Sequence, residues 1–243
     1  MILYYETSQQ RRCVNTVGQV VHTLPQGLPV YGVQSLEGEI YLLRPKGRDI
    51  VEVYDVITYN LLRCLTVPNC RNVNDMKICA HCRCIYITDA ITECIHKLGL
   101  HNGATQHQWP VNDKPHNLSV NKSHNLLVTC PYVRKIKEFC SDGNLLRELT
   151  LHDDVIYPWH AIQLTSGQFI VCHGVGSDVV HRVSKISADG RHIVHSHGGQ
   201  QGSDTGQYNA PVYLAVDNSE FVFVADLKNR CVTLLSPTLN YMR

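Results

Sequence analysis

A run of cysteine and histidine residues offers the clearest metal-ligand chemistry in the chain, Cys79-Ala80-His81-Cys82-Arg83-Cys84, with Cys70, Cys94 and His96 nearby in the sequence. Four thiolate or imidazole groups could hold zinc tetrahedrally. However, the second close pair that marks a strong zinc site is missing. Cys84 and Cys94 also fall in a strand pattern, in which alternate side chains are buried. We therefore predict core thiols, with no metal site and no cofactor.

A second set of polar residues recurs at corresponding positions of a repeating pattern, Asp75, Asn117, His160 and Tyr213. It contains one carboxylate and one imidazole, whereas a hard cation needs more carboxylate oxygen and a three-histidine site lacks two ligands. Neither a G-x-S-x-G nucleophile motif nor a G-x-x-x-x-G-K-[ST] phosphate loop occurs in the sequence. Because the sequence lacks these sets of metal-binding and catalytic residues, we predict that the chain is not an enzyme.

These positions belong to a repeat of short apolar strands that returns about every 40 residues. Its clearest copies begin at Pro115, Pro158 and Pro211, and turn formers such as Ser141-Asp142-Gly143-Asn144 separate the strands. No segment sustains the apolar spacing of an amphipathic helix. Because one blade cannot bury both faces of its sheet alone, the repeat predicts an all-β propeller of four-stranded antiparallel blades.

The repeat predicts a single domain over residues 1–243. Full blades are expected at residues 30–70, 71–111, 112–153 and 154–206, with a partial blade at 1–29 and a truncated blade at 207–243. Residues 12–17 and 19–24 are expected to be the third and fourth strands of the partial blade. A ring is stabilised when its terminal strands complete one blade together. We therefore expect six blades, one of them incomplete, in a chain that is part of a longer protein.

The last third of the chain carries a more specific pattern. A Gly-rich stretch at residues 198–206 precedes Pro211, a strand that ends in Ala225-Asp226, and then Asn229-Arg230. This copy resembles the NHL repeat, a family of six-bladed, TolB-like propellers. The earlier copies keep the spacing but lose the motif residues, as at Cys172-His173.

The resemblance implies a binding scaffold. NHL propellers often form the substrate-recognition end of tripartite-motif ubiquitin ligases, or bind RNA. The RING and B-box modules of a ligase are not among these residues, and a formal net charge of +1 disfavours an RNA partner. A metal-dependent hydrolase of the gluconolactonase type, also a six-bladed propeller, is the enzymatic alternative.

We predict that a protein partner binds the top face, defined as the face at which the first strand of each blade begins and the second strand ends. Varied polar side chains on one face suit recognition, because fixed polar groups give orientation and specificity. Trp159 is the expected anchor, since large aromatic residues dominate many interfaces. The predicted contact residues are Asp75, Asn117, Trp159, His160, His173, Tyr213 and Asp226.

Composition and the start of the sequence bear on the compartment. The chain has 243 residues, 44% of them hydrophobic, and they never form an 18-residue apolar run, so no membrane partner is expected. The first residues lack the basic and apolar regions of a secretory signal. Eleven cysteines, an odd number in a chain of this size, indicate reduced thiols rather than a disulfide framework. These features predict a cytoplasmic protein.

Overall fold

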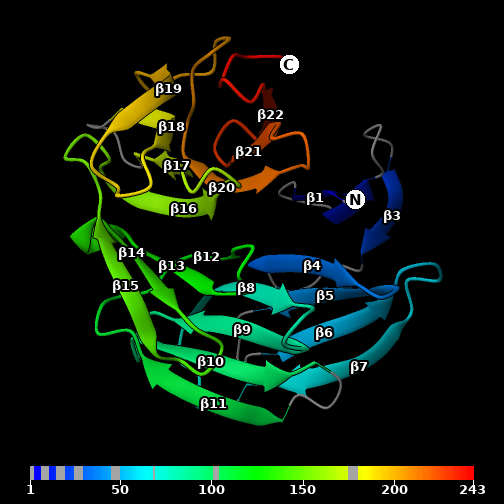
Figure 1. The fold of residues 1–243 in the computed structure, drawn as a ribbon. Helices are drawn as coiled ribbons and strands as arrows, with labels where there is room; N and C mark the ends of the chain where they lie inside the picture. The colour runs from blue at the N-terminus through cyan, green and yellow to red at the C-terminus, as the bar shows by residue number, and fades with distance from the viewer. Residues whose placement is uncertain are drawn as a thin grey trace.

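The computed structural model describes residues 3–6, 11–14, 20–24, 30–44, 50–67, 69–100, 104–174 and 180–243. Apart from one 3-10 turn at Pro131–Val133, the regular elements in these ranges are β-strands. The strands form antiparallel sheets arranged around a central axis (Figure 1). The prediction of an all-β propeller built from four-stranded antiparallel blades is confirmed.

Within each blade the strands are hydrogen-bonded in the order of the sequence. The first blade contains β4 (Gly32–Leu36), β5 (Glu39–Arg44), β6 (Ile50–Asp55) and β7 (Leu61–Thr66). The second contains β8 (Val73–Cys79), β9 (Cys84–Asp89), β10 (Cys94–Gly99) and β11 (Thr105–Pro110). The third contains β12 (Leu118–Val120), β13 (Leu126–Cys130), β14 (Lys135–Phe139) and β15 (Leu145–Thr150). The fourth contains β16 (Pro158–Gln163), β17 (Phe169–His173), β18 (His181–Ile186) and β19 (Ile193–Gly199), and the fifth contains β20 (Pro211–Val216), β21 (Val222–Asp226) and β22 (Cys231–Leu235).

The structure has five packed blades, so the prediction of six was wrong. β1 (Leu3–Glu6), β2 (Arg11–Val14) and β3 (Val20–Leu24) pair only with one another, in a separate three-stranded sheet. No strand of this sheet packs extensively against another described sheet, and none extends β22. In Figure 1 the sheet lies between the C-terminal strands and β4. Within the expected ranges 12–17 and 19–24, the described residues form β2 and β3, whereas residues 15–17 and 19 lie outside the described residues. β2 and β3 are the second and third strands of this separate sheet, and they do not complete a blade with the C-terminal strands.

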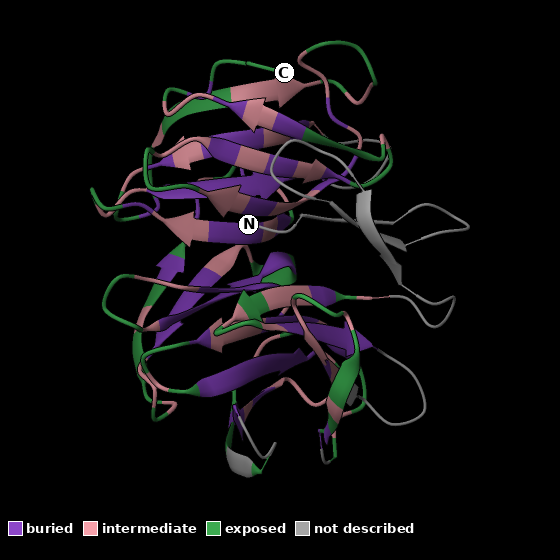
Figure 2. Ribbon diagram, turned by 90° about the vertical axis from the view of Figure 1, so that its right-hand side faces the viewer, coloured by how far each residue is buried: buried purple, intermediate pink, exposed green. Residues whose placement is uncertain are grey.

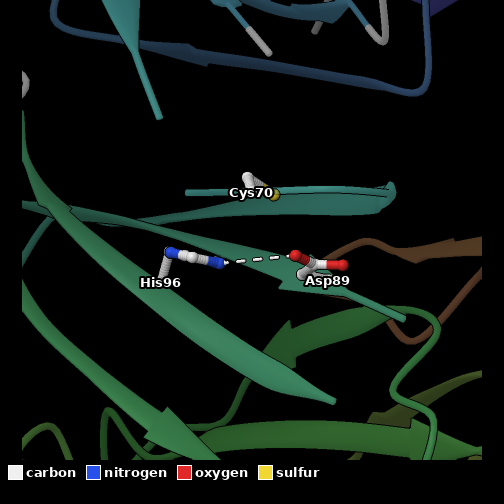
Figure 3. A group of neighbouring side chains, drawn as sticks. All are labelled: Cys70, Asp89 and His96. Carbon is white, nitrogen blue, oxygen red and sulfur yellow. Dashed lines mark ion pairs between the residues drawn. The ribbon is translucent and has the colours of Figure 1, made fainter. Parts of the chain in front are cut away.

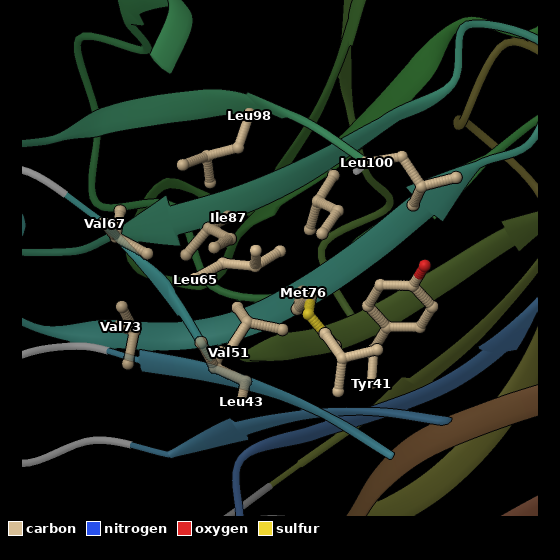
Figure 4. Close-up of a cluster of buried hydrophobic side chains, with 12 residues drawn as sticks. Tyr41, Leu43, Val51, Leu65, Val67, Val73, Met76, Ile87, Leu98 and Leu100 are labelled. Atoms are coloured by element: carbon tan, nitrogen blue, oxygen red, sulfur yellow. The ribbon is translucent and has the colours of Figure 1, made fainter. Parts of the chain in front are cut away.

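The hydrophobic core lies between neighbouring blades rather than along the axis. Between the first and second blades, Tyr41 and Leu43 of β5 pack with Ile87 of β9 and Leu98 of β10 (Figure 4). Equivalent clusters join the second blade to the third, the third to the fourth and the fourth to the fifth. Figure 2 shows the buried segments running through the middle of the sheets. Each blade is thus stabilised mainly by the apolar surface that it shares with its neighbours.

The first blade has one face toward the second blade and one face away from it, and the face away from the second blade shows why the series of packed blades begins here. Ile40 and Leu42 of β5 are buried on this face, and the described residues that cover them, Val33 and Tyr54 among them, belong to the same blade. The cluster is small compared with those between blades. No apolar interface with a sixth blade is therefore formed by the described residues.

The turn between β14 and β15 shows how local chemistry sets the blade edge. Gly143 has a φ of +83°, in the left-handed region that glycine adopts without steric penalty. A Cβ atom here would also lie 2.6 Å from the Trp109 ring, on the outer strand of the preceding blade. This position therefore requires glycine both for the turn and for close packing of two blades.

The described residues include no helix with the length and apolar character needed to cross a bilayer.

Candidate functional site at the top face

Four of the predicted site residues come together at the axis, on or directly before the inner strands of four blades. Asp75 lies on β8, Asn117 directly before β12, His160 on β16 and Tyr213 on β20. Asp75 and His160 are each 1% exposed and Asn117 is 7% exposed, whereas Tyr213 is half-buried. The alignment of the repeats therefore located a real cluster, but most of it lies beneath the surface.

Asp75 joins the second blade to the third. Its Oδ2 accepts a hydrogen bond from the backbone N–H of Leu118 at 2.8 Å, and its Oδ1 accepts one from Met76 at 2.8 Å. Burial raises the pKa of Asp75 to about 7, although these hydrogen bonds and the Lys77 charge favour the ionised form. Burial, followed by the Asp75 carboxylate, also raises the pKa of Tyr213 well above its usual value. The axis is thus a region of low dielectric that disfavours charge.

His160 is held by the inner strands on either side of it. Its Nδ1 accepts a hydrogen bond from the backbone N–H of Leu214 at 3.1 Å, so Nε2 carries the proton and donates to the carbonyl of Leu118 at 3.0 Å. The ring stacks on Tyr213, with the ring centroids 4.2 Å apart. Burial lowers the pKa of His160 to about 3. Both ring nitrogens are therefore occupied, and the imidazole is neutral at physiological pH.

Asn117 connects the third blade to the fifth. Its side-chain amide donates to the carbonyl of Val212 at 3.1 Å, and its Oδ1 lies 2.6 Å from Nδ1 of His116. The backbone N–H of Asn117 donates a hydrogen bond to the hydroxyl oxygen of Thr129 at 3.1 Å. These polar groups hold the inner strands together, which satisfies buried groups that would otherwise lack partners.

Trp159 lies beside this cluster and is half-buried. Its ring meets the His116 ring edge to face, with centroids 3.8 Å apart, and packs against the apolar cluster between the fourth and fifth blades. The indole Nε1 is buried and has no hydrogen-bond partner among the described residues. Trp159 is therefore partly structural, and its predicted role as the anchor for a partner stays a prediction.

His173 and Asp226, at the ends of second strands, are both buried. His173 Nε2 bonds to the Ser184 hydroxyl at 2.9 Å, and burial lowers the pKa of His173 to about 4. The same arrangement recurs: the last residue of the second strand meets the residue of the third strand that lies two places beyond its register partner. The pairs of this kind are His173 with Ser184, Asp89 with His96, and Arg44 with Glu52. In these three blades the polar residue at the end of the second strand therefore contacts the third strand of its own blade.

Asp226 shows what the motif residues of the last copy do. Its carboxylate accepts hydrogen bonds from the backbone N–H of Asn209, at 2.9 and 3.0 Å, and from the Asn229 side chain at 2.7 Å. Asn229 also donates to the carbonyl of Gly202 at 2.8 Å. The motif thus ties the Gly-rich loop to the start of the first and third strands.

The exposed part of the top face is formed by loops that the sequence analysis did not select. Large apolar side chains follow the second strand in three blades: Ile91 is 59% exposed, Tyr132 is 70% exposed and Leu227 is 63% exposed. A sequence signal for them exists, because each lies one or two residues after a second strand. These three side chains lie on the same face of three blades, and exposed apolar side chains that gather into one patch mark interaction surfaces.

A shallow recess of about 380 Å³ lies beside Tyr132, between the second and third blades. The Tyr132 ring meets Tyr157 edge to face at 6.3 Å, and the Lys114 ammonium lies 5.6 Å from its centroid. The recess is lined by Glu93, Asn112, Asp113, Lys114, Cys130, Tyr132 and Val133. It combines an aromatic wall with charges of both signs, as protein-binding surfaces do.

Lys137 forms a buried ion pair with Asp113, one of the residues that line the recess. Its ammonium is buried, 2.6 Å from Asp113 Oδ2 and 2.7 Å from the carbonyl of Val111. Burial alone would lower the pKa of Lys137, but the hydrogen bond and charge of Asp113 outweigh it and raise the pKa. The ion pair therefore fixes the Asp113 side chain at the edge of the recess.

Comparisons with known proteins support the fold. No protein-family model matches the chain, and no curated protein matches its sequence. A protein of unknown function from Bacteroides caccae is similar in structure, with a TM-score of 0.73 at 13% identity over 99% of this chain and 91% of that one. Virginiamycin B lyase from Staphylococcus aureus superposes with a TM-score of 0.62 at 11% identity over 88% of this chain and 68% of the lyase.

This chain is a β-propeller. A catalytically inactive variant of the same lyase, with one histidine replaced by alanine and with quinupristin bound, gives a TM-score of 0.65 at 12% identity over 100% of this chain and 72% of the variant. As many as 1190 chains of solved structures match this fold, so the likeness does not select among their functions. The comparisons leave a binding scaffold and an enzyme both open.

Proposed function

We propose that this chain is a non-enzymatic, NHL-like propeller module that binds a protein partner through its top face. The observation that carries the proposal is the set of exposed apolar side chains on the loops of that face, beside the recess at Tyr132. Tyr132 is 70% exposed, and the ring of Tyr157 and the ammonium of Lys114 lie against it. An aromatic side chain held by its neighbours loses little rotamer freedom on binding, which favours it as an anchor.

The contacts at Asp226 support the NHL-like part of the proposal. The residues that carry the resemblance, Asp226 and Asn229, bond to each other and to the Gly-rich loop. Asp89, at the same place in the second blade, likewise accepts the backbone N–H groups of Arg71 and Asn72 before the first strand. The copies that lack the full motif thus retain part of its hydrogen bonding. The specific form of the proposal is the substrate-recognition part of a ubiquitin-ligase-type protein.

The state of the axial residues argues against the enzymatic alternative. His160, the candidate base near neutral pH, has both ring nitrogens engaged by the backbone. A general base must present a free lone pair to its substrate. Asp75 is a single carboxylate, already bound by two backbone N–H groups, and the axis gives a divalent cation of the gluconolactonase type too few oxygen ligands.

Charge and thiol chemistry bear on the partner and the compartment. A net charge of +1 provides no basic surface for RNA, so a protein is the preferred partner. The ten cysteines that the structure describes form no disulfide, and four of them are buried. Such a set is typical of proteins in a reducing compartment, and we propose a cytoplasmic location.

Site-specific photocrosslinking tests the proposal. A crosslinking amino acid replaces Tyr132 in one protein and Ile57 in another, because Ile57 is 82% exposed on the turn between β6 and β7, at the opposite face. We expect one partner to crosslink at position 132 and not at position 57. Its affinity, measured by calorimetry with the purified partner, should fall about 30-fold for Tyr132→Ala, which corresponds to the loss of about 2 kcal/mol. Ile57→Ala should bind as the parent chain does. Equal crosslinking at both positions, or unchanged affinity of Tyr132→Ala, would refute the proposal.

A further inference from the structure

Three potential metal ligands converge at the top edge of the interface between the first and second blades. They are Cys70, which precedes β8, Asp89 at the end of β9 and His96 on β10. One ligand atom from each residue lies within 4.8 Å of the other two. Figure 3 shows the His96 ring turned toward the Asp89 carboxylate, with the Cys70 side chain beside them.

The fold brings these residues together by well-defined contacts. Asp89 pairs in register with Cys94, so His96, two residues further along β10, lies diagonally across on the same face of the sheet. The backbone N–H of Arg71 donates to Asp89 Oδ2 at 2.8 Å, which brings the preceding residue, Cys70, to the carboxylate. Hydrogen bonds of this kind hold a ligand in place before a metal arrives.

We propose that Cys70, Asp89 and His96 form a zinc-binding site with three protein ligands. His96 Nε2 lies 3.8 Å from Asp89 Oδ2, which is too long for a hydrogen bond. In a tetrahedral zinc site, ligand atoms about 2.0 to 2.3 Å from the ion lie about 3.4 to 3.6 Å from one another. The three side chains therefore need movements on the order of 1 Å or less to bind the ion.

Charge and ligand type also favour zinc. Asp89 and His96 are fully buried, so an ion here must form a nearly neutral complex. A thiolate and a carboxylate neutralise a divalent ion, and the imidazole adds no charge. Thiolate and imidazole together select zinc over magnesium or calcium, which prefer oxygen ligands.

The geometry also fixes what the site leaves open. Cys70 is half-buried, whereas the other two ligands are not accessible, so solvent reaches the site from the Cys70 side. A zinc ion with three protein ligands keeps a fourth position for water or for a group from solution. The site would also tie the segment between β7 and β8 to β9 and β10, and it does not depend on the proposed partner binding.

The site differs from the one that the sequence suggested. The Cys79–Cys82 segment forms a tight turn in which the Cys82 backbone N–H donates to Cys79 Sγ, and neither residue belongs to a metal-ligand cluster among the described residues. The metal ligands considered from the sequence did not include Asp89, because sequence spacing does not connect this carboxylate to Cys70 and His96.

Cobalt substitution tests the proposal on the reduced, purified chain. With Co²⁺ added, we expect tetrahedral visible bands and a thiolate-to-cobalt charge-transfer band that saturate at one ion per chain and disappear when one equivalent of zinc is added. Cys70→Ser should abolish the charge-transfer band. Cys82→Ser, which changes another half-buried cysteine on the turn between β8 and β9, at the other end of β9 from Asp89, should retain it.

Folding is checked separately, because a variant at a buried ligand could fail to fold. Cys70 is half-buried, and the circular dichroism spectrum of Cys70→Ser should match that of the parent chain. Zinc should raise the unfolding midpoint of the parent chain and of Cys82→Ser, but not that of Cys70→Ser. The absence of a charge-transfer band in the parent chain would overturn the proposal whatever the variants do. A band that survives in Cys70→Ser and is lost in Cys82→Ser would overturn it as well.

Discussion

Replacing Asp75 by asparagine tests whether the axial cluster is structural. Asp75 is 1% exposed, and burial raises its pKa from 3.8 to about 7. Between these two values the folded chain keeps a proton at Asp75 that the unfolded chain has lost. The folded state therefore binds more protons in this window, and its stability falls as the pH rises through it. The stabilising effect of the proton is fully present below pH 3.8 and is lost once the pH passes about 7.

The size of the effect follows from the shift. Each unit of pKa difference corresponds to about 1.4 kcal/mol, so the parent chain should lose about 2 to 3 kcal/mol through Asp75 between pH 5 and pH 7. Asp75→Asn has no such titration and keeps a side-chain oxygen for the Leu118 N–H. We expect the stability of the variant relative to the parent chain to increase by this amount over the same interval.

Urea unfolding of both proteins at several pH values measures this difference. Burial lowers the pKa of His116 to about 4 and of His160 to about 3, so acid destabilises both proteins as unfolded histidines gain protons. These contributions are shared and largely cancel in the difference between the two curves. Asp204→Asn, at an exposed carboxylate, controls for the removal of a surface charge. Parallel curves for Asp75→Asn and the parent chain would show that the axial carboxylate stays charged, and the reasoning about the axis would fail.

Two further substitutions test the packing of the blades. Gly143→Ala should lower the free energy of unfolding by about 2 kcal/mol or more, because it combines a left-handed φ with a Cβ that meets Trp109 at 2.6 Å. Gly38→Ala has a similar φ of +81° with open space around it, so a loss of about 1 kcal/mol is expected, and equal losses in urea unfolding would mean that the ring contact is unimportant. Asn229→Ala should destabilise the chain by about 1 to 3 kcal/mol, because it removes a partner of the buried Asp226 carboxylate. Calorimetric melting of Asn229→Ala measures the loss, and a melting temperature equal to that of the parent chain would show that the motif asparagine does not hold the loop.

Local pattern was sufficient for the strands and their turns. Alternating apolar residues and turn formers such as Gly143 depend on neighbours in sequence, so the four-stranded antiparallel blades could be predicted without the structure. The number of blades could not be predicted in the same way. Packing between blades depends on whether one sheet presents an apolar face to another, and β1–β3 pair with one another instead of extending β22.

For the candidate site, too, some features could be predicted from the sequence and others could not. Alignment of the repeats was enough to group Asp75, Asn117, His160 and Tyr213, because equivalent residues of a repeat occupy equivalent places around an axis. Their burial depends on partners far away in the sequence, as when Leu118 binds Asp75 and Leu214 binds His160. A sequence pattern shows which residues are polar, but only the tertiary structure decides whether backbone groups from other blades have already bound them.

The exposed surface and the metal-ligand cluster were decided by tertiary structure alone. In the sequence Tyr132 looks like one more apolar residue, but in the structure it lies on the 3-10 turn after β13, outside the apolar clusters between blades, and is exposed. Cys70 and His96 are separated along the chain and meet Asp89 only through strand register and the hydrogen bond from Arg71. The sequence by itself determined the strand pattern and the repeat that aligns the axial residues. The stacking of blades decided which side chains are buried, exposed or brought within reach of one another, because these properties depend on contacts between residues distant in the chain.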